Sequence, residues 1–116
     1  MLLAFRGVTA LVAFLHLGFL FLEMFLWATP TGLKIFKMTA AQAEATKVLA
    51  QNQGLYNGFL SAGLVYGLVT GDLKVTVLFL IFVVVAGVFG AVTAAPNILF
   101  IQALPALVAL TLRFFL

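Results

Sequence analysis

The side chains of this sequence that could do chemistry are an acid, a histidine and a group of amides in an otherwise apolar chain. An ionisable group in an apolar segment is costly, so Glu23 is a functional candidate by default. Amide and phenol groups both donate and accept hydrogen bonds, so they could hold the polar group of a ligand. The predicted ligand-binding residues are His16, Glu23, Asn52, Gln53, Tyr56, Asn57 and Gln102.

Simpler roles are open for each of these side chains. Amides inside membrane helices often serve only as hydrogen-bonded links between helices, worth under about 2 kcal/mol each. His16 could be a neutral core residue, and Glu23 could hydrate near a membrane surface or pair with Lys47. A pocket is the interpretation we favour, because the segment NQGLYNGF at 52–59 gathers more polar groups within two turns than such links require.

The composition indicates a protein that resides in lipid. Of 116 residues, 66% are hydrophobic and 8% charged, and the mean hydropathy is +1.30. Soluble domains carry about 25% charged residues, and a soluble fold of this composition would expose large apolar patches. The run VTVLFLIFVVVAGVFGAV does not alternate as a barrel strand would, so helices are expected.

Residue counts narrow the function classes. The chain has no cysteine, which removes disulfide and thiolate metal sites. One histidine and three acids are too few to favour a multi-ligand metal centre, so we expect no metal and no cofactor. The net charge of +3 is spread over segment ends, which is typical of membrane-facing loops and does not indicate a nucleic-acid partner.

Hydrophobic segments predict an all-α fold, a bundle of four transmembrane helices joined by short loops. A span needs about 20 apolar residues. We expect one domain over residues 1–116, with spans at about 2–27, 48–69, 75–94 and 97–115. The first stretch is interpreted as a retained span, because no A-x-A cleavage site follows it. Thr39 and Gln42 have capping-box spacing, so the second helix should begin at Ala40 and run to about Val69. Pro96 should stop the third span, and Pro105 should kink the fourth.

Four spans place both termini on one side of the cell membrane. Basic residues then divide almost evenly between the two sides, and we expect cytoplasmic termini in a multi-pass protein. Membrane lipids are the expected surroundings, and Trp27 is expected to serve as an anchor at the membrane surface. Four short helices enclose little volume, which leaves a homo-oligomer open as a further assembly.

Depth along the helices predicts where the polar groups meet. At 1.5 Å per residue, Glu23 lies ~6 Å below the surface near the first loop, Asn52 to Asn57 ~3–10 Å and Gln102 ~8 Å. His16 would lie deeper, near the level of Ser61. Gly54 and Gly58 form a small-residue stripe that lets helices approach closely. The sequence therefore predicts a polar funnel with Glu23 at its mouth.

Four blocks of sequence carry a family resemblance. They are HLGFLFLEMFLW, TKVLAQNQGLYNGFLSAGL, GVFGAVT and QALPALVAL. Together they resemble short bacterial integral membrane proteins known as domain of unknown function 1304, over nearly the whole chain. The resemblance implies a four-helix membrane protein, and it supplies neither a reaction nor a ligand.

Three classes of function are compatible with these residues. The first is binding or transport of a small amphipathic molecule or lipid, with Glu23 as its charge or proton partner. The second is an accessory or structural membrane subunit whose polar side chains hold a partner helix. The third is an intramembrane enzyme acting on a lipid or thiol conjugate, in which Tyr56 or Glu23 would act as acid or base.

Overall fold

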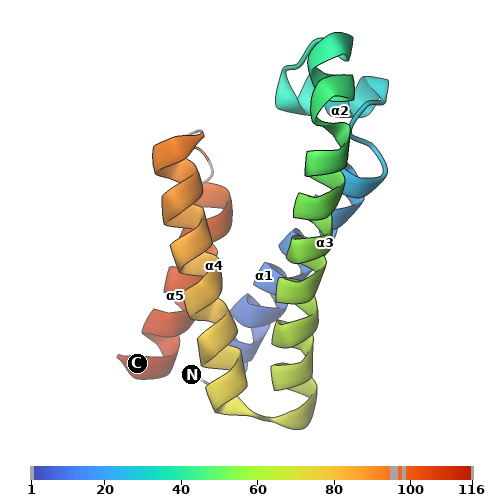
Figure 1. Ribbon diagram of the computed structural model, residues 1–116. Helices are drawn as coiled ribbons and strands as arrows, with labels where there is room; N and C mark the ends of the chain where they lie inside the picture. The colour runs from blue at the N-terminus through green and yellow to red at the C-terminus, as the bar shows by residue number, and fades with distance from the viewer. Residues whose placement is uncertain (1, 95–96, 98, 116) are drawn as a thin grey trace. The chain divides into compact units, whose positions relative to one another are not determined.

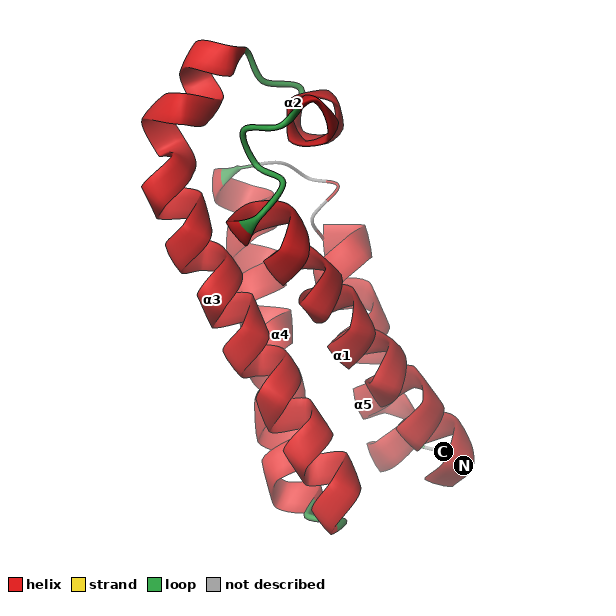
Figure 2. Cartoon of the chain, turned by 90° about the vertical axis from the view of Figure 1, so that its right-hand side faces the viewer, coloured by secondary structure: helices red, strands yellow, loops and turns green. Residues whose placement is uncertain are grey.

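The protein is an all-helical chain in the computed structural model, which describes residues 2–94, 97 and 99–115. These residues form helices and no strand, so the all-α prediction is confirmed (Figures 1 and 2). In chain order the elements are α1 (Leu2–Met24), α2 (Pro30–Phe36), α3 (Ala40–Thr70), α4 (Leu73–Thr93), the π-helix η1 (Leu99–Ala103) and α5 (Leu104–Phe114).

Two compact units divide the chain. One consists of Met1–Leu15 with Leu60–Leu116, and the other is His16–Phe59. The long helices α1 and α3 each contribute one part to each unit. The prediction of a single domain stays a prediction.

The first unit has an apolar core in which small residues face larger ones. Its buried members are Phe5, Val12, Ala13, Leu64, Leu80, Val83, Ala106 and Ala109. Polar links support this packing. The Ser61 hydroxyl donates to the Ala13 carbonyl over 2.9 Å, and the Arg6 guanidinium donates to the Leu68 carbonyl over 2.8 Å. Ser61 therefore has the linking role that serine often takes between apolar helices.

Local capping explains where α3 and α4 begin. The Gln42 N–H donates to the Thr39 hydroxyl over 3.1 Å, and the Thr39 N–H donates to Gln42 Oε1 over 2.9 Å. The predicted capping box is therefore confirmed, and α3 begins at Ala40. Asp72 accepts the Val75 N–H over 3.1 Å, so α4 begins at Leu73, two residues before the predicted span.

The first loop differs from the prediction. Helix α1 ends at Met24, three residues before the predicted end of the span at Trp27. Pro30 follows the end of α1 and is also the first residue of α2. Thr29 is the N-cap of α2, and proline fits the first position of a helix. Lys37 then ends α2 with φ of 54°.

The predicted fourth span is a π-helix followed by a short α-helix. Pro105 lacks an N–H, and its ring would clash with the carbonyl four residues earlier in an α-helix. The turn before it, η1, is wound more widely, so a local distortion lies at the place where a kink was predicted. Pro96, which was expected to stop the third span, lies outside the described residues.

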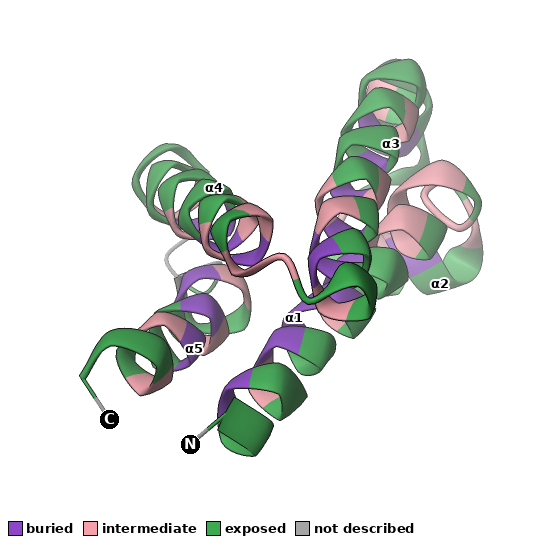
Figure 3. Cartoon of the chain, turned by 90° about the horizontal axis from the view of Figure 1, so that it is seen from below, coloured by how far each residue is buried: buried purple, intermediate pink, exposed green. Residues whose placement is uncertain are grey.

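Two helices, α1 and α4, are long and apolar enough to cross a membrane. The core helix of a soluble protein also passes that test, but it would be mostly buried. Only 22% of the most apolar window of α4 is buried within the chain (Figure 3). Its exposed residues, such as Phe89 and the 81% exposed Val92, are as apolar as its buried Leu80 and Val83. Such a helix suits an apolar surrounding on every face.

The other two predicted spans do not meet the same requirement for both length and hydropathy. Helix α3 contains 31 residues and is long enough, but its amides and glycines lower its hydropathy. Helix α5 contains only 11 residues. Among the described helices, α1 and α4 therefore meet the measure of length and hydropathy for a span, and α3 and α5 do not.

A close contact between α4 and η1 gives a first prediction. A Cβ atom on Gly87 would lie 2.7 Å from Ala103 Cβ and 2.8 Å from the Ala103 backbone nitrogen. Gly87→Ala should therefore lower the unfolding free energy by ~1–3 kcal/mol through overpacking. Thermal unfolding in detergent, followed by circular dichroism, measures this change.

Gly7→Ala is the matched control, because nothing lies within 4 Å of a Cβ at Gly7. Alanine there should leave stability unchanged or raise it by up to ~1 kcal/mol, since glycine is a poor helix former. Equal or higher stability of both variants would contradict the contact.

Candidate ligand pocket

Glycines in the unit His16–Phe59 bring the end of α1 close to the first half of α3. A Cβ on Gly54 would lie 2.6 Å from Met24 Cγ and 3.1 Å from Glu23 Cβ, and one on Gly58 would lie 2.6 Å from Leu20 Cδ1. Real Cβ atoms do not approach that closely, so a larger residue would require the Met24 or Leu20 side chain to move. At Gly54 the Leu20 carbonyl oxygen also lies only 3.2 Å from such a Cβ, so the constraint is tighter there than at Gly58. The predicted close approach at these two glycines is confirmed.

This approach places Glu23 against Asn57. The Asn57 amide nitrogen donates a hydrogen bond to Glu23 Oε1. Asn57 is only 5% exposed, whereas Glu23 is half-buried. A buried amide needs such a partner, because an unpaired polar group inside a protein costs ~1–3 kcal/mol. The hydrogen bond therefore fixes the orientation of the carboxylate at the wall of a hollow.

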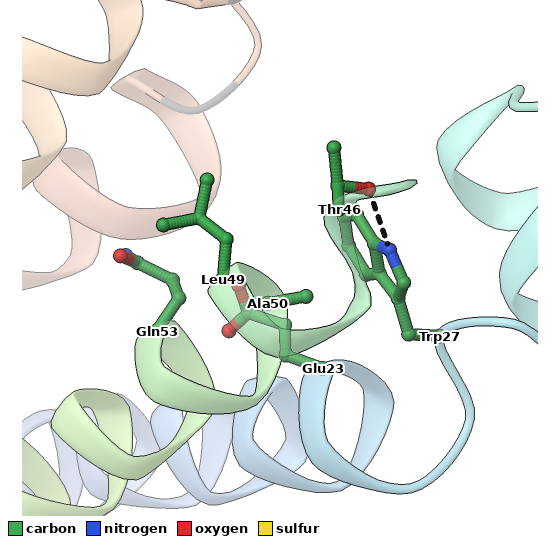
Figure 4. A pocket seen from close by; sticks show the side chains of 6 residues that line it. All are labelled: Glu23, Trp27, Thr46, Leu49, Ala50 and Gln53. Carbon is green, nitrogen blue, oxygen red and sulfur yellow. Dashed lines mark hydrogen bonds between the residues drawn. The ribbon is translucent and has the colours of Figure 1, made fainter. Parts of the chain in front are cut away.

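The hollow beside this carboxylate has a volume of about 240 Å³ and is named here the Glu23 pocket. Glu23 comes from α1 and Trp27 from the loop after it, and the remaining lining residues come from α3 (Figure 4). The lining residues are Glu23, Trp27, Thr46, Leu49, Ala50 and Gln53. An indole, a leucine and an alanine thus surround a single ionisable group.

Hydrogen bonds hold the indole wall of the Glu23 pocket. Trp27 Nε1 donates to the Thr46 hydroxyl over 3.0 Å, as Figure 4 shows. That hydroxyl donates its own proton to the Gln42 carbonyl over 2.8 Å. The indole also packs against the Phe36 ring of α2, with ring centroids 4.7 Å apart. Trp27 is therefore anchored from both α2 and α3.

Five of the seven predicted residues do not line the Glu23 pocket, and the two that do are Glu23 and Gln53, which lies at its rim. Asn57 is the one of these five that binds Glu23. Asn52 is exposed on α3, and Tyr56 is 57% exposed with its ring edge-on to Phe59. His16 is fully buried on α1 and makes an edge contact with the Phe19 ring at 5.3 Å. Gln102 lies on η1 in the other unit. Participation of His16, Asn52, Tyr56 and Gln102 in one ligand site stays a prediction.

Sequence reasoning missed Thr46, Leu49 and Ala50 and gave Trp27 only an anchoring role. A signal was present. Thr46, Ala50, Gln53 and Asn57 recur every three or four residues, so they share one face of a helix. That face meets α1 at Gly54. It reaches back to Thr46, six residues closer to the first loop than the segment 52–59.

The chemistry available in the Glu23 pocket is recognition of a polar group beside an apolar one. Among the described residues, no group of three or more histidine, cysteine or acidic side chains could hold a metal ion. The one ionisable side chain lining the Glu23 pocket is acidic, and none is basic.

The residues that the structure describes form a small all-helical fold in which two helices, α1 and α4, are long and apolar enough to cross a membrane. The chain matches the family model described as "Protein of unknown function (DUF1304)" over residues 10–114, and it belongs to this family. It is also similar to the "Uncharacterized protein YpaA" of Lactococcus lactis subsp. lactis (strain IL1403). The two are 30% identical over 112 residues, which cover 93% of this chain and 94% of the relative. No solved structure matches the chain.

The hydrogen bond between Glu23 and Asn57 gives a second prediction. Asn57→Ala removes the donor and should lower the unfolding free energy by ~1–3 kcal/mol. Asn52→Ala, the matched control on the same helix, should change it by less than ~0.5 kcal/mol because Asn52 is exposed. A double-mutant cycle with Glu23→Ala, followed by chemical unfolding in detergent, isolates the pair. Additive effects of the two substitutions would show that the pair is not coupled.

Proposed function

We propose that this chain is a four-span membrane protein that binds a small amphipathic molecule or lipid in the Glu23 pocket. The observation that carries the proposal is an acidic side chain held by a buried amide at the wall of a mostly apolar hollow. Acids in apolar helices are rare, and they usually mark a functional site. A few placed polar groups among apolar walls is the usual composition of a small-molecule site.

Membrane insertion is supported by α1 and α4 and by the lengths of the remaining helices. At 1.5 Å per residue, α3 is ~46 Å long, which exceeds a hydrocarbon thickness of ~30 Å, so its first turns would lie among the headgroups. Together η1 and α5 reach ~24 Å, a shortfall that local thinning of the bilayer can accommodate. The four crossings would be α1, α3, α4 and η1 with α5.

The Glu23 pocket would then lie just inside one membrane surface. Glu23 is one residue from the end of α1, and tryptophan is a typical residue of the headgroup level. Lys34 and Lys37, both exposed on and after α2, would lie among the headgroups on the same side. A molecule with one polar end and one apolar end could enter from the lipid with its polar end toward this surface.

Exposed polar groups on α3 favour a second candidate function, an accessory role in which a partner covers this helix. Asn52 and Tyr56 are exposed within the predicted span 48–69. An amide facing hydrocarbon is costly unless another chain supplies its hydrogen bonds. A second copy of this chain or a partner helix would meet that requirement, and such an assembly is compatible with ligand binding in the Glu23 pocket.

The four-span topology gives a third prediction. The chain has no cysteine, so single-cysteine variants report one position each. Thr31→Cys in the first loop should react with a membrane-impermeant maleimide in intact cells. Lys74→Cys, on the side of the termini, should react only after the membrane is permeabilised. Labelling of both positions in intact cells would show that α3 does not cross the membrane, which would contradict the four-span topology.

Ligand binding gives a fourth prediction. Native mass spectrometry from a mild detergent should find a small molecule or lipid retained by the wild-type protein. Ala50→Phe and Leu49→Phe both place a ring in the Glu23 pocket and should reduce the retained fraction at least ~tenfold, which corresponds to ~1.4 kcal/mol of affinity.

Ala45→Phe is the matched control, since Ala45 is an exposed residue of α3 outside the Glu23 pocket. It should retain the molecule as the wild type does, and circular dichroism should report equal helicity for all variants. Equal retention by the filled and the control variants would place the molecule elsewhere on the protein.

A further inference from the structure

We infer that the molecule bound in the Glu23 pocket carries an ammonium group that pairs with the Glu23 carboxylate. This inference rests on the proposed function and names the chemical class of its ligand. It follows from three features of the Glu23 pocket, namely its charge, the use of its hydrogen-bond donors and the size of its apolar part.

The charge of the Glu23 pocket favours a cation. Glu23 is the one ionisable residue of the lining, and the partner that holds it is a neutral amide rather than a basic side chain. A half-buried carboxylate without a positive partner loses hydration that a bound cation can replace. Phosphate, sulfate or carboxylate headgroups would instead meet a like charge, which is strongly unfavourable away from bulk water.

The hydrogen-bond donors of the lining are mostly engaged within the protein. The Trp27 N–H is donated to Thr46, and the Thr46 hydroxyl proton is donated to the Gln42 carbonyl. An ionised carboxylate accepts only, and a side-chain amide such as Gln53 can accept through its oxygen. A ligand that supplies N–H donors can therefore pair with both the Glu23 carboxylate and the Gln53 oxygen, whereas a ligand that only accepts has the Gln53 amide nitrogen as its partner in the lining.

Asn57 acts as a positioning residue in this recognition. Its amide occupies one side of Glu23 Oε1 and sets the plane of the carboxylate. The two carboxylate oxygens have about four lone-pair sites, so several acceptor positions remain for a ligand N–H. Because Asn57 already orients the carboxylate, the Glu23 side chain loses little further conformational entropy when it pairs with an ammonium group.

The apolar part of the Glu23 pocket sets the size of the ligand. Trp27, Leu49 and Ala50 supply the apolar walls, and the volume of about 240 Å³ is below that of most drug-sized sites. One aromatic ring or a short alkyl chain fits this volume. The expected class is therefore a small arylalkyl or alkyl ammonium ion.

Trp27 is the one tryptophan of the chain, so its fluorescence reports directly on the Glu23 pocket. The protein in nanodiscs of zwitterionic lipid is titrated with 2-phenylethylammonium, 2-phenylethanol and phenylacetate, which share one ring and differ in charge. The ammonium should give a saturable change at a concentration about tenfold or more below that of the alcohol, because hydrogen bonds to charged groups are worth ~1.5–3 kcal/mol. Phenylacetate should give no saturable change.

Substitutions separate the carboxylate from general attraction of cations to the protein. Glu23→Gln keeps a group that accepts from Asn57 but removes the charge, so ammonium binding should weaken about tenfold, to the level of the alcohol. Glu44→Gln is the matched control, because Glu44 is an exposed acid of α3 outside the Glu23 pocket. It should bind the ammonium as the wild type does.

The outcomes distinguish this inference from the proposed function. Saturable binding of ammonium and alcohol with equal affinity, blocked by Ala50→Phe, would overturn the ammonium class and leave the Glu23 pocket as a binding site. Absence of a saturable response to every probe would overturn the ammonium class, and the retained molecule in native mass spectrometry would then decide whether the Glu23 pocket binds a ligand. The comparison of three probes on the wild-type protein decides the charge class even if Glu23→Gln does not fold.

Discussion

The close approach of α1 and α3 at Gly54 is the constraint on which the candidate site depends. A side chain at that position would meet Met24 and Glu23 and separate the two helices. With hydrogen alone at Gly54, Asn57 reaches the Glu23 carboxylate one turn further along α3. The close approach at Gly54 thus lies next to the polar contact of Asn57, and the Glu23 pocket lies on the loop side of both.

The short helix α2 has a structural role in the same unit. Its beginning is fixed by the Thr29 cap and Pro30, and its end by Lys37 in the left-handed conformation. Phe36 then contacts the indole of Trp27, which α3 holds from the other side through Thr46. The first loop is thus a defined wall of the Glu23 pocket rather than a simple connection. This explains why a residue expected to serve as an interfacial anchor also lines the candidate site.

Helix ends and glycine contacts were predictable because their causes are local. The spacing of Thr39 and Gln42 fixes the start of α3, and Gly54 and Gly58 are spaced for a close helix contact. The π-helix before Pro105 was anticipated only as a kink, since proline identifies the place of a distortion but not the form that it takes. The start of α2 at Pro30 was missed, because a proline that ends one helix can also begin the next.

The sequence by itself determined an all-helical, apolar chain with an acid and several amides where lipid-facing residues would be expected. Composition and periodicity suffice for this prediction, because neither depends on contacts between distant residues. Only the tertiary structure decided which amide pairs with Glu23. Asn52, Gln53 and Asn57 are equivalent in composition, but a rotation of 100° per residue places one in the helix contact, one at the rim and one outside. That choice depends on the face α3 presents to α1, which the glycines set through contacts between distant parts of the chain.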